Sequence, residues 1–308
     1  MCCKLFKVFN SHLSKIIFLI NCLVFLNLIG CFKDPVSMIP NQEPDKDPDY
    51  IPEGAWVTCS PYKWTHDGEP YFGDYCITYS DCCSYQFKQK VGQFVDEKFI
   101  DVLTVFNFEN MSDLLYPMDY NKVDVYIDRY HPENMAAAWW GTVIMTFSSE
   151  NLYAGHNYLF KHELTHVFQF LIEGHYNLST PVWFTEAIAI YGGGGLWGIR
   201  NSDDLDQWIT SNSDDPNQGN PIYIEVWDDF PPGADITGYY YNVFDLTMRY
   251  FLDPSGLGKS IEDVLNLFYD LRNDISFSTA FQSNFGLDVN TFEDEYYERM
   301  RIYLASIN

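Results

Sequence analysis

A single helical segment constrains the fold of this 308-residue chain more than any other. Residues 160–170 read FKHELTHVFQF, and the apolar side chains in this region recur at the three- and four-residue spacing of an amphipathic helix. Gly174 is a natural C-terminal stop for this helix. The loop that follows is short, so a second helix predicted over residues 180–192 can pack antiparallel to the first.

The first helix carries the chemistry of a metal half-site. His162 and His166 are four residues apart, so their imidazoles lie on one face of the helix, one turn apart, and can bind one zinc ion from the same side. Glu163 lies about 100° round the helix, where it can reach a water on the metal. The alternative is that both histidines are packing residues of an ordinary amphipathic helix.

The second helix carries a carboxylate on an otherwise apolar segment. It is expected to begin at Thr180, which can cap it, and to end at Gly192. Glu186 lies in its middle, and burying a carboxylate there costs free energy unless the group has a partner. Antiparallel packing would bring Glu186 towards His162 and His166, where zinc would be that partner. The alternative is that Glu186 pairs with an arginine or caps another group.

The rest of the chain predicts an α+β fold. Strands are expected at residues 75–80, 122–130 and 141–147, and the apolar spacing of residues 87–103 indicates a helix. Helices dominate after about residue 156. This order favours a small mixed sheet, with an edge strand, packed beside a mostly helical subdomain.

The zinc-site residues resemble a known family. HELTH, followed after 19 residues by Glu186 within WFTEAIAIY, resembles the gluzincin metallopeptidases. The pattern is closest to the aminopeptidase-N-like and collagenase-like members, in which a tryptophan stands three residues before the glutamate ligand. The resemblance is strongest over residues 156–191. It implies a zincin-type helical subdomain, Glu163 as general base, and zinc ligands at His162, His166 and Glu186.

Other assignments of the third ligand fit less well. A metzincin has a third histidine six residues after the second, where this chain has Ile172. Glu173 and His175 are further candidates for the third ligand, but both lie near the end of the helix.

The resemblance also implies a tyrosine that donates a hydrogen bond to the oxyanion of the reaction. The segment GYYYNVFDLTMRYF offers Tyr239, Tyr240 and Tyr241, and the family spacing favours Tyr241. The family has a small residue three positions later, where this chain has Phe244.

Substrate binding is expected near the strand that precedes HELTH. Residues 141–146 are either an edge strand that pairs with the peptide backbone of the substrate or a buried core strand. Aminopeptidase-N-like enzymes hold a free N-terminus with a Gly-Ala-Met-Glu-Asn run in this strand, whereas this chain reads GTVIM. The difference favours an endopeptidase, or a peptidase of unknown specificity, over an aminopeptidase.

The N-terminus predicts export. Residues 1–30 combine a lysine-containing start with an apolar run. Residues 28–31 read LIGC, which resembles the lipobox of bacterial lipoproteins. The resemblance implies cleavage after Gly30 and a lipid on Cys31 that anchors the chain to a bacterial membrane, on its periplasmic or cell-surface side. The alternative is an uncleaved anchor helix. Residues 31–54 are predicted to be a disordered acidic tether and residues 55–308 the folded domain.

The net charge of the chain argues against nucleic acid as a partner. The formal net charge of −25 makes the chain repel phosphate backbones, so no nucleic acid partner is expected.

In an exported domain, local disulfides are the expected state of four clustered cysteines, and a cysteine-only metal site is the alternative. These four are Cys59, Cys76, Cys82 and Cys83.

Together these features predict a lipid-anchored zinc metallopeptidase that hydrolyses peptide or protein substrates with Zn²⁺ as its cofactor. The first alternative is a catalytically inactive surface binding protein that keeps the same fold. The second is a zinc hydrolase that acts on a bond other than a peptide.

Overall fold

The computed structural model divides into two units, Met1–Tyr50 and Ile51–Asn308, and all described residues belong to the second unit. The described residues are 56–59, 65–66, 69–70, 75–79, 84–108, 123–128, 136–139, 142–147, 152, 154–174, 180–213, 221–223 and 240–307. The predicted signal peptide, Cys31 and the tether therefore lie outside them. Within the described part, no helix combines the length and apolar character needed to cross a membrane.

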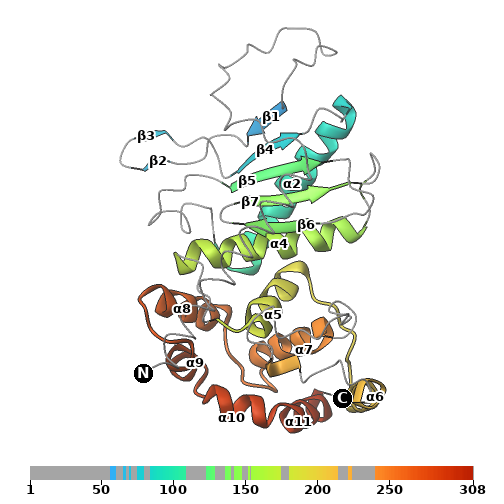
Figure 1. The fold of residues 1–308 in the computed structure, drawn as a ribbon, viewed down its shortest axis with the longest axis vertical. Coiled ribbons are helices and arrows are strands. Elements are labelled where there is room, and N and C mark those ends of the chain that lie inside the picture. The colour runs from blue at the N-terminus through green and yellow to red at the C-terminus, as the bar shows by residue number, and fades with distance from the viewer. Residues whose placement is uncertain are drawn as a thin grey trace, which may run out of the picture. The chain divides into compact units, whose positions relative to one another are not determined.

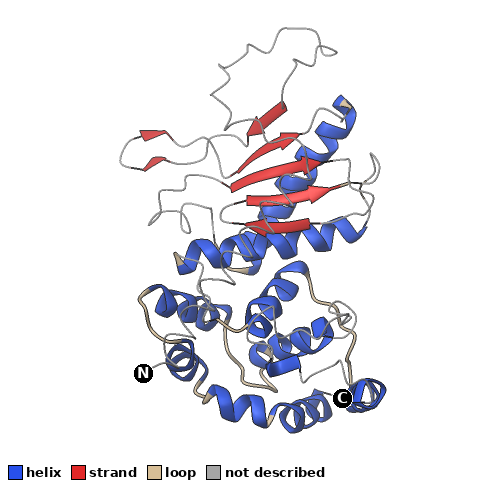
Figure 2. Cartoon of the chain, viewed as in Figure 1, coloured by secondary structure: helices blue, strands red, loops and turns tan. Residues whose placement is uncertain are grey.

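A five-stranded mixed sheet forms one half of this unit (Figures 1 and 2). The two outer pairs are antiparallel and the two inner pairs are parallel. In spatial order the strands are β1 (Trp56–Cys59), β4 (Tyr75–Tyr79), β5 (Val123–Asp128), β7 (Thr142–Thr146) and β6 (Ala136–Trp139). Strands β2 (Thr65–His66) and β3 (Glu69–Pro70) pair separately.

Among the described side chains, one face of the inner strands is apolar and buried, because side chains alternate along each strand. Ile77, Val125 and Val143 are register partners on adjacent strands, and all three are 0% exposed. Helix α2 (Tyr85–Val105) packs here: the Tyr79 hydroxyl donates to the Lys88 carbonyl at 3.0 Å. The opposite face is more polar and more exposed, as expected for alternation in a sheet covered on one side.

Strand β7 corrects one expectation from the sequence. It lies between β5 and β6, so the prediction that residues 141–146 form an edge strand is wrong. The strand is internal to the sheet, with Val143 and Met145 buried and Ile144 exposed. The edge strand is β6, an alanine-rich segment, Ala136–Trp139, that pairs antiparallel with β7. Helix α4 (Ala154–Glu173) contacts this edge, as Figure 1 shows.

Helix α4 packs closely against α5 (Val182–Gly193). A Cβ atom at Gly192 would stand 2.0 Å from Oγ1 of Thr165, so only glycine lets the two backbones approach this far. On its other side α4 contacts α2 through aromatic rings, including Phe160 against Phe94 and Phe168 against Phe99. The helix that carries HELTH is therefore fixed from both sides.

The remaining helices form the second half of the unit and confirm the predicted α+β class. They are α6 (Ser202–Ser213), the 3-10 turn η1 (Pro221–Tyr223), α7 (Tyr241–Leu252), α8 (Ile261–Arg272), α9 (Phe277–Phe285), α10 (Val289–Asp294) and α11 (Tyr296–Ile307). Their core is aromatic, and Trp183 of α5 packs into it against Phe281 and Phe292. The Trp183 indole also donates to Glu293 at 3.0 Å.

The cysteine prediction falls mostly outside the described residues. The β1–β4 register places Cys59 directly opposite Cys76. Cys82 and Cys83 lie outside the described residues.

Candidate metal centre

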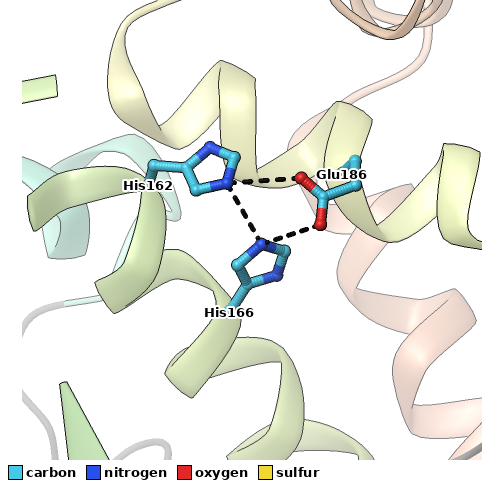
Figure 3. A group of neighbouring side chains, drawn as sticks. All are labelled: His162, His166 and Glu186. Carbon is cyan, nitrogen blue, oxygen red and sulfur yellow. Dashed lines mark hydrogen bonds and ion pairs between the residues drawn. The ribbon is translucent and has the colours of Figure 1, made fainter. Parts of the chain in front are cut away.

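Three side chains from two helices converge on one point (Figure 3). His162 and His166 project from α4, and their Nε2 atoms are 3.2 Å apart. Glu186 projects from α5 and presents one carboxylate oxygen to each imidazole, at 3.3 Å from both Nε2 atoms. The structure thus brings together the three residues that the sequence predicts as ligands.

The donor atoms of the three side chains are close enough together to hold one metal ion, since one ligand atom from each residue lies within 4.8 Å of the others. Nitrogen and oxygen ligands of tetrahedral zinc stand about 2.0–2.2 Å from the ion, which places them roughly 3.3–3.5 Å from one another. The three observed separations are 3.2, 3.3 and 3.3 Å, although the two carboxylate separations end on different oxygens. The cluster has the composition and spacing of a metal site.

Burial and mutual charge shift the pKa values of the groups in this cluster. Glu186 and His162 are each only 3% exposed. Burial alone would raise the pKa of Glu186, but the two imidazoles hold it well below its usual value. Burial alone would lower the pKa of His166, but the Glu186 carboxylate raises it to about 9. Without a metal the cluster is therefore an ion pair between Glu186 and a protonated His166.

Gln169 orients one of the imidazoles and was not predicted from the sequence. Its Oε1 lies 2.8 Å from Nδ1 of His166, and its Nε2 donates to the Thr185 carbonyl at 2.9 Å. When Nδ1 of His166 donates to this oxygen, Nε2 is the free ligand nitrogen that faces Glu186. Gln169 thus couples the ligand geometry of α4 to the backbone of α5.

Glu163 lies beside the cluster, between α4 and the edge strand. Its carboxylate accepts a hydrogen bond from the backbone N–H of Ala138 in β6. Burial raises the pKa of Glu163, and the charges of His166 and His162 oppose that rise. A carboxylate with a raised pKa next to the three ligand side chains is suited to accept and return a proton.

Tyr239, Tyr240 and Tyr241 are the candidate tyrosines, and of the two that the structure describes, Tyr241 is the one whose side chain reaches the cluster of His162, His166 and Glu186. It is the first residue of α7, its ring stacks on His162 with centroids 5.6 Å apart, and its hydroxyl donates to Glu186. Burial and then the charge of Glu186 raise its pKa, which keeps the phenol protonated. Phe244, where the family pattern has a small residue, packs against the Tyr241 ring at 6.2 Å.

The remaining candidate residues either lie away from the cluster or are not among the described residues. Glu173 accepts a hydrogen bond from the Thr180 hydroxyl at 2.9 Å, at the far end of α4 from His162. Tyr240 is 0% exposed and belongs to the hydrophobic core. His175 and Tyr239 lie outside the described residues.

A second buried polar group holds the backbone beyond α5. The Asp245 carboxylate accepts from the backbone N–H groups of Leu196 and Trp197, both at 3.1 Å, and pairs with Arg249 at 3.1 Å. Arg249 also lies over the Trp197 ring at 5.0 Å. This clamp fixes the segment that follows the Glu186 helix, and the sequence pattern gave no signal for it because its partners are mostly backbone groups.

Comparison with known proteins adds a distant structural likeness. No protein-family model matches the chain, and no curated protein matches it. Among solved structures, it is similar to an M1 zinc metallopeptidase from Deinococcus radiodurans, an E323A mutant bound to a Tyr-Ser-Ala substrate. The identity is 12%, the TM-score is 0.40, and the match covers 81% of this chain and 51% of that one. This chain thus spans about half the length of that protein.

Proposed function

We propose that this chain is a zinc metallopeptidase that cleaves peptide bonds within peptides or proteins. The observation that carries the proposal is the meeting of two imidazoles and one carboxylate beside Glu163. The two Nε2 atoms are 3.2 Å apart, and each lies 3.3 Å from a different oxygen of Glu186. Two imidazoles and one carboxylate are a ligand set that zinc favours in catalytic sites, where a fourth position is left for water or substrate. The gluzincin-like sequence pattern supports the same assignment.

Glu163 is assigned the role of general base. When bound, zinc supplies a Lewis acid that lowers the pKa of a water and polarises the scissile carbonyl. Glu163 accepts a proton from the attacking water and returns it to the leaving amine. Its hydrogen bond to the Ala138 N–H fixes the carboxylate on the side of the cluster that faces β6.

Tyr241 is assigned the role of oxyanion donor. Its phenol stacks on His162 and stays protonated, so it can donate to the oxygen that gains charge in the transition state. Because β6 is the edge of the sheet, we place an extended peptide substrate along this strand, next to the Ala138 N–H that binds Glu163. This placement moves the expected substrate strand from residues 141–146 to Ala136–Trp139.

The full chain, purified without chelator, tests the proposal. We expect about one bound zinc per chain by mass spectrometry of metals, and cleavage of a fluorogenic peptide library. 1,10-Phenanthroline should abolish that cleavage and added zinc should restore it. Zinc without turnover would support the inactive binding protein instead. No zinc, even after reconstitution, would rule out the metallopeptidase.

Replacing Gln169 with alanine is expected to weaken zinc binding about 10–100-fold, the usual cost of losing a group that orients a ligand histidine. The reason is that Nδ1 of His166 loses its acceptor at 2.8 Å, so the tautomer and ring orientation are no longer fixed. Competition with a fluorescent zinc chelator measures the change. Gln169→Glu is the matched control, because it keeps an acceptor for Nδ1 and should retain more affinity than Gln169→Ala.

Zinc affinity is expected to rise with pH by about tenfold per unit from neutral pH until His166 has lost its proton. The pKa of His166 is raised to about 9, so this imidazole is protonated at pH 7 and must release its proton to bind metal. Calorimetry at pH 7 in buffers of different ionisation enthalpy should show about one proton released per zinc. An affinity that does not change between pH 7 and pH 9 would contradict this assignment.

We also propose that the chain is exported and anchored to a bacterial membrane through lipid on Cys31. The support is the LIGC sequence that ends the apolar N-terminal run. Detergent phase partitioning of the protein expressed in bacteria tests the anchor. The parent should enter the detergent phase and Cys31→Ser should not. Equal partitioning of both would reject the lipid.

A further inference from the structure

A second tyrosine lies against the same ligand histidine. Tyr158 stands one helical turn before His162 on α4, and their ring centroids are 5.6 Å apart. Tyr241 contacts His162 at the same 5.6 Å from α7. Two phenols from different helices therefore pack on one imidazole of the cluster.

The hydroxyl of Tyr158 is buried and has no hydrogen-bond partner among the described residues. Buried hydroxyls are nearly always paired, because leaving one unpaired costs free energy. Tyr158 and His162 are four residues apart on α4, so their side chains share the helix face that meets the cluster. The Tyr241 hydroxyl, in contrast, has a hydrogen-bond acceptor in Glu186. Tyr158 thus holds a phenol proton that no described group accepts.

The surrounding structure leaves room for this ring. A Cβ atom at Gly193 would stand 2.8 Å from Cε2 and 3.0 Å from Cδ2 of Tyr158. Any larger residue at Gly193 would push the ring out of its position. The glycine run after Glu186, predicted only as a helix end, therefore also accommodates Tyr158 beside His162.

We propose that Tyr158 is a catalytic residue whose hydroxyl donates a hydrogen bond to an oxygen of the substrate held at the metal, as a second donor beside Tyr241. The ligand class is a peptide carbonyl that becomes a tetrahedral oxyanion. A neutral phenol suits this position because the carboxylates of Glu163 and Glu186 lie at the cluster, and a charged donor would pair with them instead. The proposal rests on the proposed zinc peptidase function.

The test uses the zinc-loaded full chain and a peptide hydroxamate, whose oxygens bind zinc and accept hydrogen bonds. Tyr158→Phe removes the hydroxyl and keeps the ring packing. We expect it to bind zinc as the parent does, to melt at the same temperature, and to bind the hydroxamate about 10-fold or more weakly in calorimetry. Where turnover is measured, kcat should fall by more than KM changes. Tyr303→Phe, on α11, is the control that removes a mostly buried hydroxyl elsewhere.

Each outcome has a distinct meaning. Equal hydroxamate binding by the parent and Tyr158→Phe would overturn this inference and leave the peptidase proposal intact. Zinc loss in Tyr158→Phe would also overturn it, because Tyr158 would then only position His162. A parent that holds zinc but binds no hydroxamate would overturn both proposals. Weaker binding at unchanged zinc content supports Tyr158 as the second donor.

Discussion

Glu163→Gln is expected to lower peptide hydrolysis about 10²–10⁴-fold while zinc stays bound, the usual loss when a general base is removed. Glutamine keeps the shape of the side chain and can still accept from the Ala138 N–H, so the fold and the cluster should be undisturbed. It cannot accept the proton of the attacking water. Initial rates on a fluorogenic peptide, with metal content measured on the same samples, check this expectation.

The matched control for Glu163→Gln is Glu262→Gln, on the exposed first turn of α8. It removes one carboxylate of the same kind from a surface far along the chain, and we expect parental rates. If Glu163→Gln cleaved the peptide as fast as the parent, Glu163 would not be the base. If it lost zinc as well, the effect on rate would report on metal binding instead of proton transfer.

Glu186→Ala is expected to reduce bound zinc from about one ion per chain to a small fraction, and to abolish hydrolysis. The carboxylate is the only group from α5 in the three-residue cluster, and both ligand histidines lie within 3.3 Å of it. Two imidazoles on one helix leave zinc with half of a four-ligand shell. Mass spectrometry of metals on freshly purified protein, before and after zinc addition, measures the loss.

Glu173→Ala provides the control for Glu186→Ala and also tests the other third ligand. Glu173 is equally buried at 3% exposed, but it bonds to the Thr180 hydroxyl instead of the cluster. We expect this variant to lose stability and to keep its zinc. Zinc loss in Glu173→Ala with retention in Glu186→Ala would reverse the ligand assignment.

The ligand cluster could be predicted because its information is local. His162 and His166 are related by helical periodicity, and Glu186 follows after one short connection. A short loop between two apolar helices leaves few ways to pack them, so the polar groups of each helix meet. The α+β class was predicted correctly for the same reason: its helices and inner strands show clear apolar periods.

The edge of the sheet could not be predicted because it depends on distant pairing. Ala136–Trp139 is rich in alanine, which favours helices, yet it forms β6 by pairing with β7. Tertiary context overrides local preference here. Without β6, residues 141–146 have the sequence pattern of an edge strand, so the predicted edge falls one strand later in the chain than the observed one.

The supporting residues of the site were hidden for another reason. Gln169 and Tyr158 lie three residues after His166 and four residues before His162, on the same face of α4. Their spacing places both residues next to the ligand histidines. Nothing in the sequence, however, distinguishes an orienting amide or a free phenol from the many polar and aromatic side chains of this chain.

The bond between Trp183 and Glu293 affects when the chain can acquire metal. Trp183 stands three residues before Glu186, and its partner is made 110 residues later during synthesis. The aromatic groups around Trp183, such as Phe281 and Phe292, also come from the last part of the sequence. HELTH can form its helix early and α5 packs against it, but the aromatic partners of Trp183 arrive only with α9 and α10. We therefore expect the helix that carries Glu186 to reach its final packing late, and a chain truncated before α9 to hold zinc less tightly than the full chain.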